Sequence, residues 1–299
     1  MDHTIDELHT LADVVRWGAS QFNKNNLYFG HGTDNAIDEA VALVLHALSL
    51  PHDLPDPLWY ARLTYPEKQH IIELFQKRVQ KRIPVAYLTN QAWFAGLDFY
   101  VDQRVLIPRS PIAELIEQHF TPWVEPETIH RMLDLCTGSG CIAIASAILA
   151  FPQAEIDAVD VSLDALEVTK RNIKNYGLSD NVHAVHSDLF HNLHGIHYDL
   201  IVCNPPYVDE IALKTMPTEY HHEPRIGLEA GKDGLSLVRQ ILKEAKKHLT
   251  STGVLIVEVG ASQPALEAAY PDVPFTWLDF KRGGEGVFLL TAQHLEKYF

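Results

Sequence analysis

Short apolar runs alternate with helical segments through the middle of this chain, and the alternation limits the possible folds more than any other feature. The runs occupy residues 132–135, 156–159, 182–185 and 200–203. Each has the length of a strand, and a helical segment separates it from the next. Strands joined through helices pair in parallel, because the helix returns the chain to the same edge of the sheet. We therefore predict an α/β fold with a mostly parallel sheet.

Three further apolar runs complete the expected sheet. They lie at residues 254–259, 275–280 and 287–290. Only residues 281–286 separate the last two runs, and so short a connection cannot hold a crossover helix. The spacing predicts that these last two strands form an antiparallel hairpin.

Residues 1–84 are expected to form a separate helical domain, which we assign to substrate recognition. Thr4 and Glu7 have the spacing of a capping box, and two further helices are expected to begin near Thr33 and Pro66. The apolar residues that mark the expected buried faces are Ile5, Leu8, Ala12, Val15 and Phe22 in the first helix, Ile37, Val41, Val44, Leu45 and Leu48 in the second, and Ile71, Leu74, Phe75 and Val79 in the third.

The third of these helices is expected to end in four basic residues, Lys77, Arg78, Lys81 and Arg82. Such a cluster can contact RNA, or it can complement the negative end of the helix dipole on a solvated surface. We favour the solvated surface, because charge runs usually lie in water.

Residues 85–108 have the amino-acid composition that is typical of β-strands. Aromatic and β-branched residues predominate there, interrupted by Gly96 and Asp98. We predict a β-hairpin linker in this segment, followed by the α/β domain at residues 109–299.

Composition restricts the partners and the location of the protein. The 299 residues include 24 basic and 39 acidic ones, a formal charge of -15, which repels nucleic-acid phosphates and favours basic partners. Apolar stretches reach only about 10 residues, short of the roughly 20 that span a bilayer. The three cysteines lack C-x-x-C spacing, and the histidines between 183 and 197 lack supporting metal ligands. We expect a cytoplasmic protein with no stable DNA binding, no membrane partner and no metal.

A glycine-rich turn at residues 136–140 directly follows the first strand of the α/β domain. Ligands bind at the carboxyl ends of strands in such sheets, and Gly138 and Gly140 let the backbone approach a ligand closely. Asp160 ends the next strand, about twenty residues on, where a carboxylate can accept hydrogen bonds from ribose hydroxyls. Because Gly138-x-Gly140-x-x-Ala143 also fits the dinucleotide fingerprint, an NAD-dependent dehydrogenase stays open at this point.

Asp134, just before the turn, favours a different cofactor. Its carboxylate suits the ammonium group of a methionine moiety but would repel a pyrophosphate, although it could instead order the turn through local hydrogen bonds. Asp188 and Leu189 follow the third strand, where an adenine amine needs an acceptor and the ring needs an apolar cover. We therefore predict S-adenosyl-L-methionine as the cofactor.

The fourth strand ends in Asn204-Pro205-Pro206-Tyr207, at the same edge as the turn. An amide or aromatic amine nitrogen has a delocalised lone pair, so its N–H groups must be held by acceptors before it attacks a methyl sulfonium. Asn204 offers a side-chain oxygen and Pro205 a carbonyl oxygen, while the two prolines remove competing N–H groups and Tyr207 offers a stacking face. We predict that these four residues catalyse methyl transfer by positioning, without a covalent intermediate.

Together, residues 134–140, Asp160, residues 187–190 and the Asn-Pro-Pro-Tyr motif resemble the HemK-like family of protein glutamine N-methyltransferases over nearly the whole chain. The resemblance implies a helical N-terminal domain, a hairpin linker and a seven-stranded, Rossmann-like class I methyltransferase domain that modifies a glutamine amide. The cofactor contacts that it implies are Cys136, Thr137, Gly138, Ser139, Gly140, Asp160, Leu189 and Asn204, with Asn204 through Tyr207 forming the substrate pocket. Cys136 departs from the glycine more usual at its position.

Within this family, residues 106–115 and 222–228 are similar to the branch that modifies large-subunit ribosomal protein L-three. The release-factor branch typically has proline and aspartate where Ser110 and Pro111 stand. The resemblance also implies that Arg109 or Glu223 shapes the glutamine entrance. We therefore expect glutamine methylation of ribosomal protein L-three, free or in an assembling ribosome, with release factors as the alternative target.

Two other functions are weighed against this hypothesis. A DNA adenine methyltransferase meets the same lone-pair problem, but it needs a basic region to grip phosphates and flip its base, and the charge of -15 argues against it. A ribosome-assembly factor would keep the fold for binding alone, and the intact Asn204 and Tyr207 argue against that reading.

Overall fold

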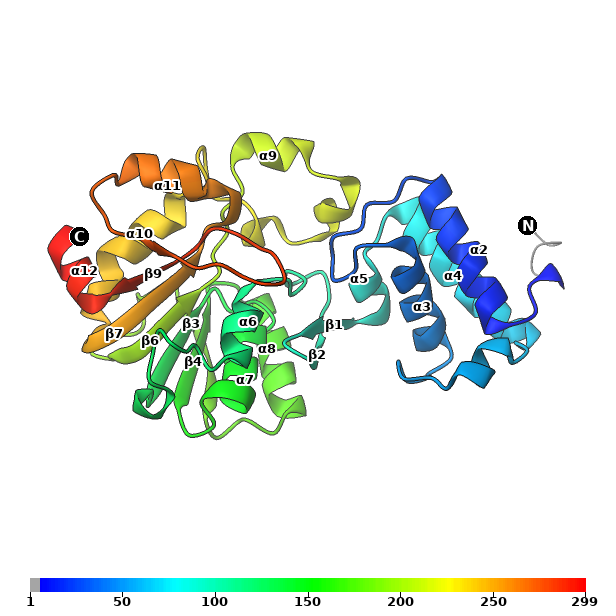
Figure 1. Ribbon diagram of the computed structural model, residues 1–299, viewed down its shortest axis with the longest axis horizontal. Helices are drawn as coiled ribbons and strands as arrows, with labels where there is room; N and C mark the ends of the chain where they lie inside the picture. The colour runs from blue at the N-terminus through cyan, green and yellow to red at the C-terminus, as the bar shows by residue number, and fades with distance from the viewer. Residues whose placement is uncertain (1–5) are drawn as a thin grey trace. The chain divides into compact units, whose positions relative to one another are not determined.

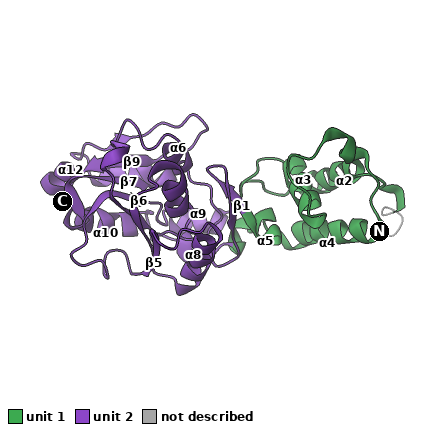
Figure 2. Cartoon of the chain, turned by 90° about the horizontal axis from the view of Figure 1, so that it is seen from below, with its two compact units in different colours: residues 1–91, 217–222 green, residues 92–216, 223–299 purple. Residues whose placement is uncertain are grey.

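The computed structural model describes residues 6–299 and divides the chain into two compact units (Figure 1, Figure 2). Unit 1 contains residues 1–91 and 217–222, and unit 2 contains residues 92–216 and 223–299. The first boundary therefore falls after residue 91, where we predicted 84. The inclusion of 217–222 in unit 1 had no signal in the sequence, because it depends on contacts between residues far apart in the chain.

Unit 1 is built from helices. They are α2 (Leu11–Lys24), α3 (Ala36–Ala47), the short 3-10 helix η1 (Asp56–Tyr60), α4 (Tyr65–Lys81), α5 (Val85–Thr89) and the 3-10 turn η4 (Thr218–His222). The capping box predicted at Thr4 falls outside the described residues. The box that caps α2 is at Thr10 and Asp13, where each side chain accepts a hydrogen bond from the other residue's backbone N–H, at 3.1 and 3.0 Å.

The buried face of α3 differs in part from the predicted one, because Val44 and Leu45 are buried as predicted but the start of the helix packs differently. Ile37 was predicted to be buried, but it is 60% exposed. Asn35 caps the helix, and the face that packs inward is marked by Ala36, Ala40 and Leu43. The prediction followed the large apolar residues and missed that small alanines lie against the neighbouring helices.

The interpretation of the basic end of α4 as a solvated surface is wrong for Arg78. Its side chain is fully buried and pairs with Glu39 of α3 at 2.7 Å and with Glu219 of the 217–222 segment at 3.3 Å. A buried guanidinium needs such carboxylates, because an unpaired charge in the interior is very costly. The predicted face of α4 is confirmed, with Ile71, Leu74 and Phe75 buried.

The predicted hairpin is present but shorter than residues 85–108. It consists of β1 (Gln91–Phe94) and β2 (Leu97–Tyr100), whereas α5 takes up the first part of the predicted segment. Ala95 and Gly96 both have positive φ, 49° and 77°, which is the backbone of the tight turn that best matches the twist of paired strands.

Unit 2 is built on a seven-stranded sheet in the order β5-β4-β3-β6-β7-β9-β8 (Figure 1). The strands are β3 (Arg131–Leu135), β4 (Glu155–Asp160), β5 (Val182–His186), β6 (Tyr198–Cys203), β7 (Leu249–Glu258), β8 (Thr276–Trp277) and β9 (Val287–Thr291). The first five pair in parallel, and β9 runs antiparallel to both β7 and β8. All seven predicted strands and the antiparallel hairpin are confirmed.

Helices cover both faces of this sheet, because alternate residues of each strand point to opposite sides. One core contains Met132, Ile156 and Leu200 of the strands, and the other contains Leu133, Val159 and Ile201. The helices on the first face are α6 (Ile112–Glu117), α7 (Cys141–Ala145) and α8 (Leu163–Asn175), and those on the second are α10 (Ser236–Glu244), α11 (Gln263–Ala269) and α12 (Ala292–Tyr298). The strand order reverses between β3 and β6, which opens a crevice at their carboxyl ends.

Within residues 6–299, no helix is both long enough and apolar enough to cross a membrane. The same residues contain no group of three or more histidine, cysteine or acidic side chains arranged to hold a metal ion.

Candidate active site

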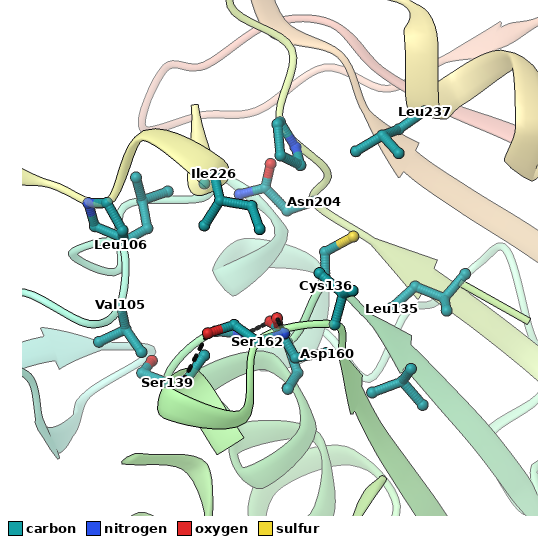
Figure 3. A pocket seen from close by; sticks show the side chains of 18 of the residues that line it. Val105, Leu106, Leu135, Cys136, Ser139, Asp160, Ser162, Asn204, Ile226 and Leu237 are labelled. Carbon is teal, nitrogen blue, oxygen red and sulfur yellow. Dashed lines mark hydrogen bonds between the residues drawn. The ribbon is translucent and has the colours of Figure 1, made fainter. Parts of the chain in front are cut away.

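A cavity of about 610 Å³ lies in unit 2 at the carboxyl ends of β3, β4 and β6 (Figure 3). This volume is within the range of cofactor pockets, and the position is where open α/β sheets bind ligands. Its lining includes residues 104–110, 135–139, 159–162, 187–189, 224–227, Asn204 and Pro206.

The turn after β3 has the unusual backbone that the glycines were predicted to allow. Gly138 and Gly140 have φ of 58° and 81°, and Cys136 adopts φ of 60° despite its side chain. A Cβ on Gly140 would lie 2.9 Å from Cγ2 of Thr169, whereas the Cβ position of Gly138 faces open space. Gly140 is therefore required for packing against α8, and Gly138 leaves room for a ligand.

Two buried polar residues of α8 hold this turn through hydrogen bonds, and neither was predicted from the sequence. The hydroxyl of Thr169 donates to the carbonyl of Gly138 at 2.8 Å, and the amide of Asn172 donates to the carbonyl of Ser139 at 2.8 Å. Asn172 also exchanges hydrogen bonds with the backbone of Tyr100. Two polar residues three positions apart on the inward face of a helix are the only sequence signal that would have pointed to them.

Asp134 lies beneath the turn and is fully buried. Its carboxylate accepts hydrogen bonds from the Thr137 hydroxyl at 2.5 Å and from the Ala143 N–H at 3.1 Å, which orders the turn. Burial raises the pKa of Asp134 to about 7. Among the described residues that line the cavity Asp134 is absent, so a direct contact with a ligand's ammonium stays a prediction.

Asp160, at the end of β4, does line the cavity. One carboxylate oxygen accepts from the Gly138 N–H and the other from the Ser162 N–H, both at 2.9 Å, and burial raises the pKa of the group. Each oxygen keeps a further acceptor position, so the residue fits a ribose with its paired hydroxyls. Asp188 and the buried Leu189 line the same cavity after β5.

The Asn-Pro-Pro-Tyr motif follows β6 at the opposite wall. The Asn204 side chain points into the cavity near Ile226 (Figure 3), and no hydrogen bond of its amide occurs within the described part of the chain. Pro206 also lines the cavity, whereas Pro205 and Tyr207 are not among the described residues of the lining, so their contact with the substrate stays a prediction. The amide of Asn204 is therefore available to a ligand, and stacking on Tyr207 stays a prediction.

Arg109 and Glu223 lie next to each other, and only Arg109 lines the cavity, so a role of either residue at the glutamine entrance stays a prediction. They form a two-pronged ion pair with distances of 2.6 and 2.9 Å, and Glu223 also accepts from the Ile107 N–H at 3.0 Å. The buried Glu223 therefore holds Arg109 and its segment in place.

This strand order, with a glycine turn, an acidic residue and the Asn-Pro-Pro-Tyr motif at the ends of β3, β4 and β6, defines a class I, Rossmann-like methyltransferase. The family model of the methyltransferase small domain matches residues 115–219.

Similar proteins make the assignment narrower. The chain is 53% identical to "Ribosomal protein uL3 glutamine methyltransferase" of Francisella tularensis subsp. tularensis over 295 residues, covering 98% of this chain and 94% of that one. It is also 53% identical to the protein of the same name from Neisseria gonorrhoeae over 290 residues, covering 97% of this chain and 96% of that one. The chain belongs to the ribosomal protein uL3 glutamine methyltransferase family.

Among solved structures, a methyltransferase from Pyrococcus furiosus matches with a TM-score of 0.47 and 20% identity, over 66% of this chain and 89% of that one.

Proposed function

We propose that this protein transfers a methyl group from S-adenosyl-L-methionine to the side-chain amide nitrogen of a glutamine in large-subunit ribosomal protein uL3, the protein called L-three above. The observation that carries the proposal is the Asn204 amide, which points into the cavity and has no hydrogen-bond partner among residues 6–299. The substrate follows from the names of two relatives that match over nearly the whole chain.

The residues of the cavity fit the cofactor. Asp160 has spare acceptors for the ribose hydroxyls, Leu189 offers an apolar cover for adenine, and the open position at Gly138 leaves room beside the turn. When bound, S-adenosyl-L-methionine supplies a methyl group on a positively charged sulfur.

The chain's own residues orient the acceptor nitrogen. The Asn204 side-chain oxygen and the Pro205 carbonyl would each accept one N–H of the glutamine amide, which turns the nitrogen lone pair out of conjugation and toward the donor. The first proline after Asn204 holds that residue in an extended conformation, so the two acceptors are fixed before the substrate binds. After the transfer the methylated nitrogen carries one proton too many and is strongly acidic, so water would take this proton and the site needs no strong base.

The charge of the protein is consistent with this substrate. A formal charge of -15 attracts a basic ribosomal protein and repels nucleic acid. We place the reaction in the cytoplasm, on uL3 that is free or in an assembling ribosome.

The test is methyl transfer from labelled cofactor to three acceptors, namely uL3, a peptide release factor and DNA, with mass spectrometry of the labelled product. We expect labelling of one uL3 glutamine, and we expect it to be slower by about 10² or more with the Asn204→Ala variant. Labelling of the release factor or of DNA, with none of uL3, would overturn the proposal. Parallel reactions on free uL3 and on complete large subunits show which form is the substrate.

A further inference from the structure

A buried carboxylate at the end of β7 binds two segments of the cavity wall at once. Glu258 is 4% exposed, and one of its oxygens accepts from the Tyr207 hydroxyl at 2.9 Å. Its other oxygen accepts from the hydroxyl of Ser110, which is also buried, at 2.5 Å. A carboxylate in this position is costly to bury, and burial raises its pKa, so its two hydroxyl donors are what offset that cost.

The backbone and the ring of Tyr207 are held by three further residues, Ser262, Gly260 and Gly234. Its carbonyl accepts from the Ser262 hydroxyl at 2.8 Å. A Cβ on Gly260 would lie 2.7 Å from the Tyr207 ring, and a Cβ on Gly234 would lie 2.4 Å from the Tyr207 carbonyl oxygen. The ring and the backbone of Tyr207 are therefore closely packed, and Glu258 accepts the hydrogen bond that the phenol donates.

Holding Tyr207 has a consequence for Asn204. Only Pro205 and Pro206 separate the two residues, and prolines leave little freedom in the backbone between them. A fixed Tyr207 therefore fixes the position from which the Asn204 amide enters the cavity. Ser110 belongs to another segment of the lining, next to Arg109, so the carboxylate also links this segment to the one that carries Asn204.

We propose that Glu258 is a positioning residue for methyl transfer, which holds the Asn-Pro-Pro-Tyr segment and the Arg109–Ser110 segment in the arrangement that the acceptor amide requires. Glu258 is not among the described residues that line the cavity, so it would act through the two segments that it binds. The inference rests on the proposed function, but its test compares variants with the wild-type protein. A wild-type protein that methylates nothing refutes the proposed function, whereas a normal Glu258 variant refutes only this inference.

The first experiment is steady-state methylation of uL3 by Glu258→Ala and Glu258→Gln. We expect the alanine variant to lose about 10- to 100-fold in kcat, because misplacing reacting groups by about 1 Å has an effect of this size. Its Kd for the cofactor, measured by calorimetry, should stay within about threefold of wild type, since the glycine turn and Asp160 are untouched. The glutamine variant has the same shape and can still bond both hydroxyls, so it should keep at least about a third of wild-type turnover. Glu267→Ala, an exposed glutamate of α11, is the matched control and should behave as wild type.

The second experiment tests whether Glu258 acts through Tyr207. We expect Tyr207→Phe to lower kcat by about tenfold, and we expect it to add little to the loss in Glu258→Ala, because both changes break the same bond. Hydrogen exchange of the backbone amides at residues 207–210 should become faster in both variants, a readout that does not require activity.

Three results would each overturn the inference. The first is a normal kcat of Glu258→Ala, and the second is a kcat of Glu258→Gln as low as that of Glu258→Ala. The third is a double variant in which the losses in kcat from Glu258→Ala and Tyr207→Phe add fully. If Glu258→Ala does not fold, Tyr207→Phe and Ser110→Ala carry the test, since each removes one hydroxyl and leaves the carboxylate in place. Normal kcat in both of these variants would then overturn it.

Discussion

The buried Asp134 makes stability depend on pH in a way that Asp134→Asn should abolish. Burial raises the pKa of this carboxyl from its ordinary 3.8 to about 7. Since one pKa unit corresponds to about 1.4 kcal/mol, keeping the group ionised in the folded protein costs about 4 kcal/mol. The folded state holds the proton more tightly than the unfolded state does. The contribution of Asp134 to stability is therefore fully present below pH 4 and is lost as the pH rises through 7.

An asparagine at position 134 has the same shape and can accept the same hydrogen bonds from Thr137 and Ala143, but it does not titrate. Between pH 5 and pH 8 the free energy of unfolding of Asp134→Asn, relative to wild type, should rise by about 3 kcal/mol. Burying the new amide N–H group lowers stability by an amount that does not depend on pH, so this effect cancels when the two pH values are compared. Urea unfolding followed by circular dichroism at the two pH values measures it.

Asp188→Asn is the matched control, because this aspartate is exposed and the substitution removes the same charge. The free energy of unfolding of this control, relative to wild type, should be the same at pH 5 and at pH 8. An equal difference at pH 5 and pH 8 for Asp134→Asn would refute the reasoning, because it would mean that Asp134 titrates alike in the folded and unfolded states.

The same variant tests the predicted attraction between Asp134 and the ammonium group of the cofactor. At pH 8 we expect Asp134→Asn to bind S-adenosyl-L-methionine about tenfold more weakly, equal to about 1.4 kcal/mol, by calorimetry. Unchanged affinity would limit Asp134 to ordering the turn.

Three further substitutions probe other parts of the molecule. Asn204→Ala should lower kcat by about 10² or more while cofactor affinity changes less, and near-normal turnover would reject its role. Asp160→Ala should weaken cofactor binding by about tenfold or more through loss of charge-assisted hydrogen bonds, and calorimetry showing wild-type affinity would contradict the ribose assignment. Arg78→Met leaves Glu39 buried without a guanidinium and leaves Glu219 paired with Arg82 alone, so unit 1 should lose about 3 to 5 kcal/mol, and unchanged hydrogen exchange in α3 and α4 would count against this.

The sequence by itself determined the architecture of unit 2 and the position of its site. Each strand is a continuous apolar run with its own local signal, and both the glycine turn and the Asn-Pro-Pro-Tyr motif come directly after such runs. Because parallel strands all end at one edge, contiguous patterns were enough to bring Gly138, Asp160 and Asn204 to one cavity.

Only the tertiary structure decided which polar residues are buried and what holds them. The sequence places Arg78 at a solvated helix end, but in the structure it is buried against Glu39 and Glu219. In the sequence Glu258 is only the last residue of a strand, but in the structure its carboxylate accepts hydrogen bonds from Tyr207 and Ser110. Thr169 and Asn172 likewise support the turn from a helix about thirty residues further on. Hydrophobic periodicity shows which residues close together in the sequence lie on the same face of a helix or strand. A buried charge or amide is instead stabilised by partners that are distant in the sequence, and only the folded structure brings these partners together.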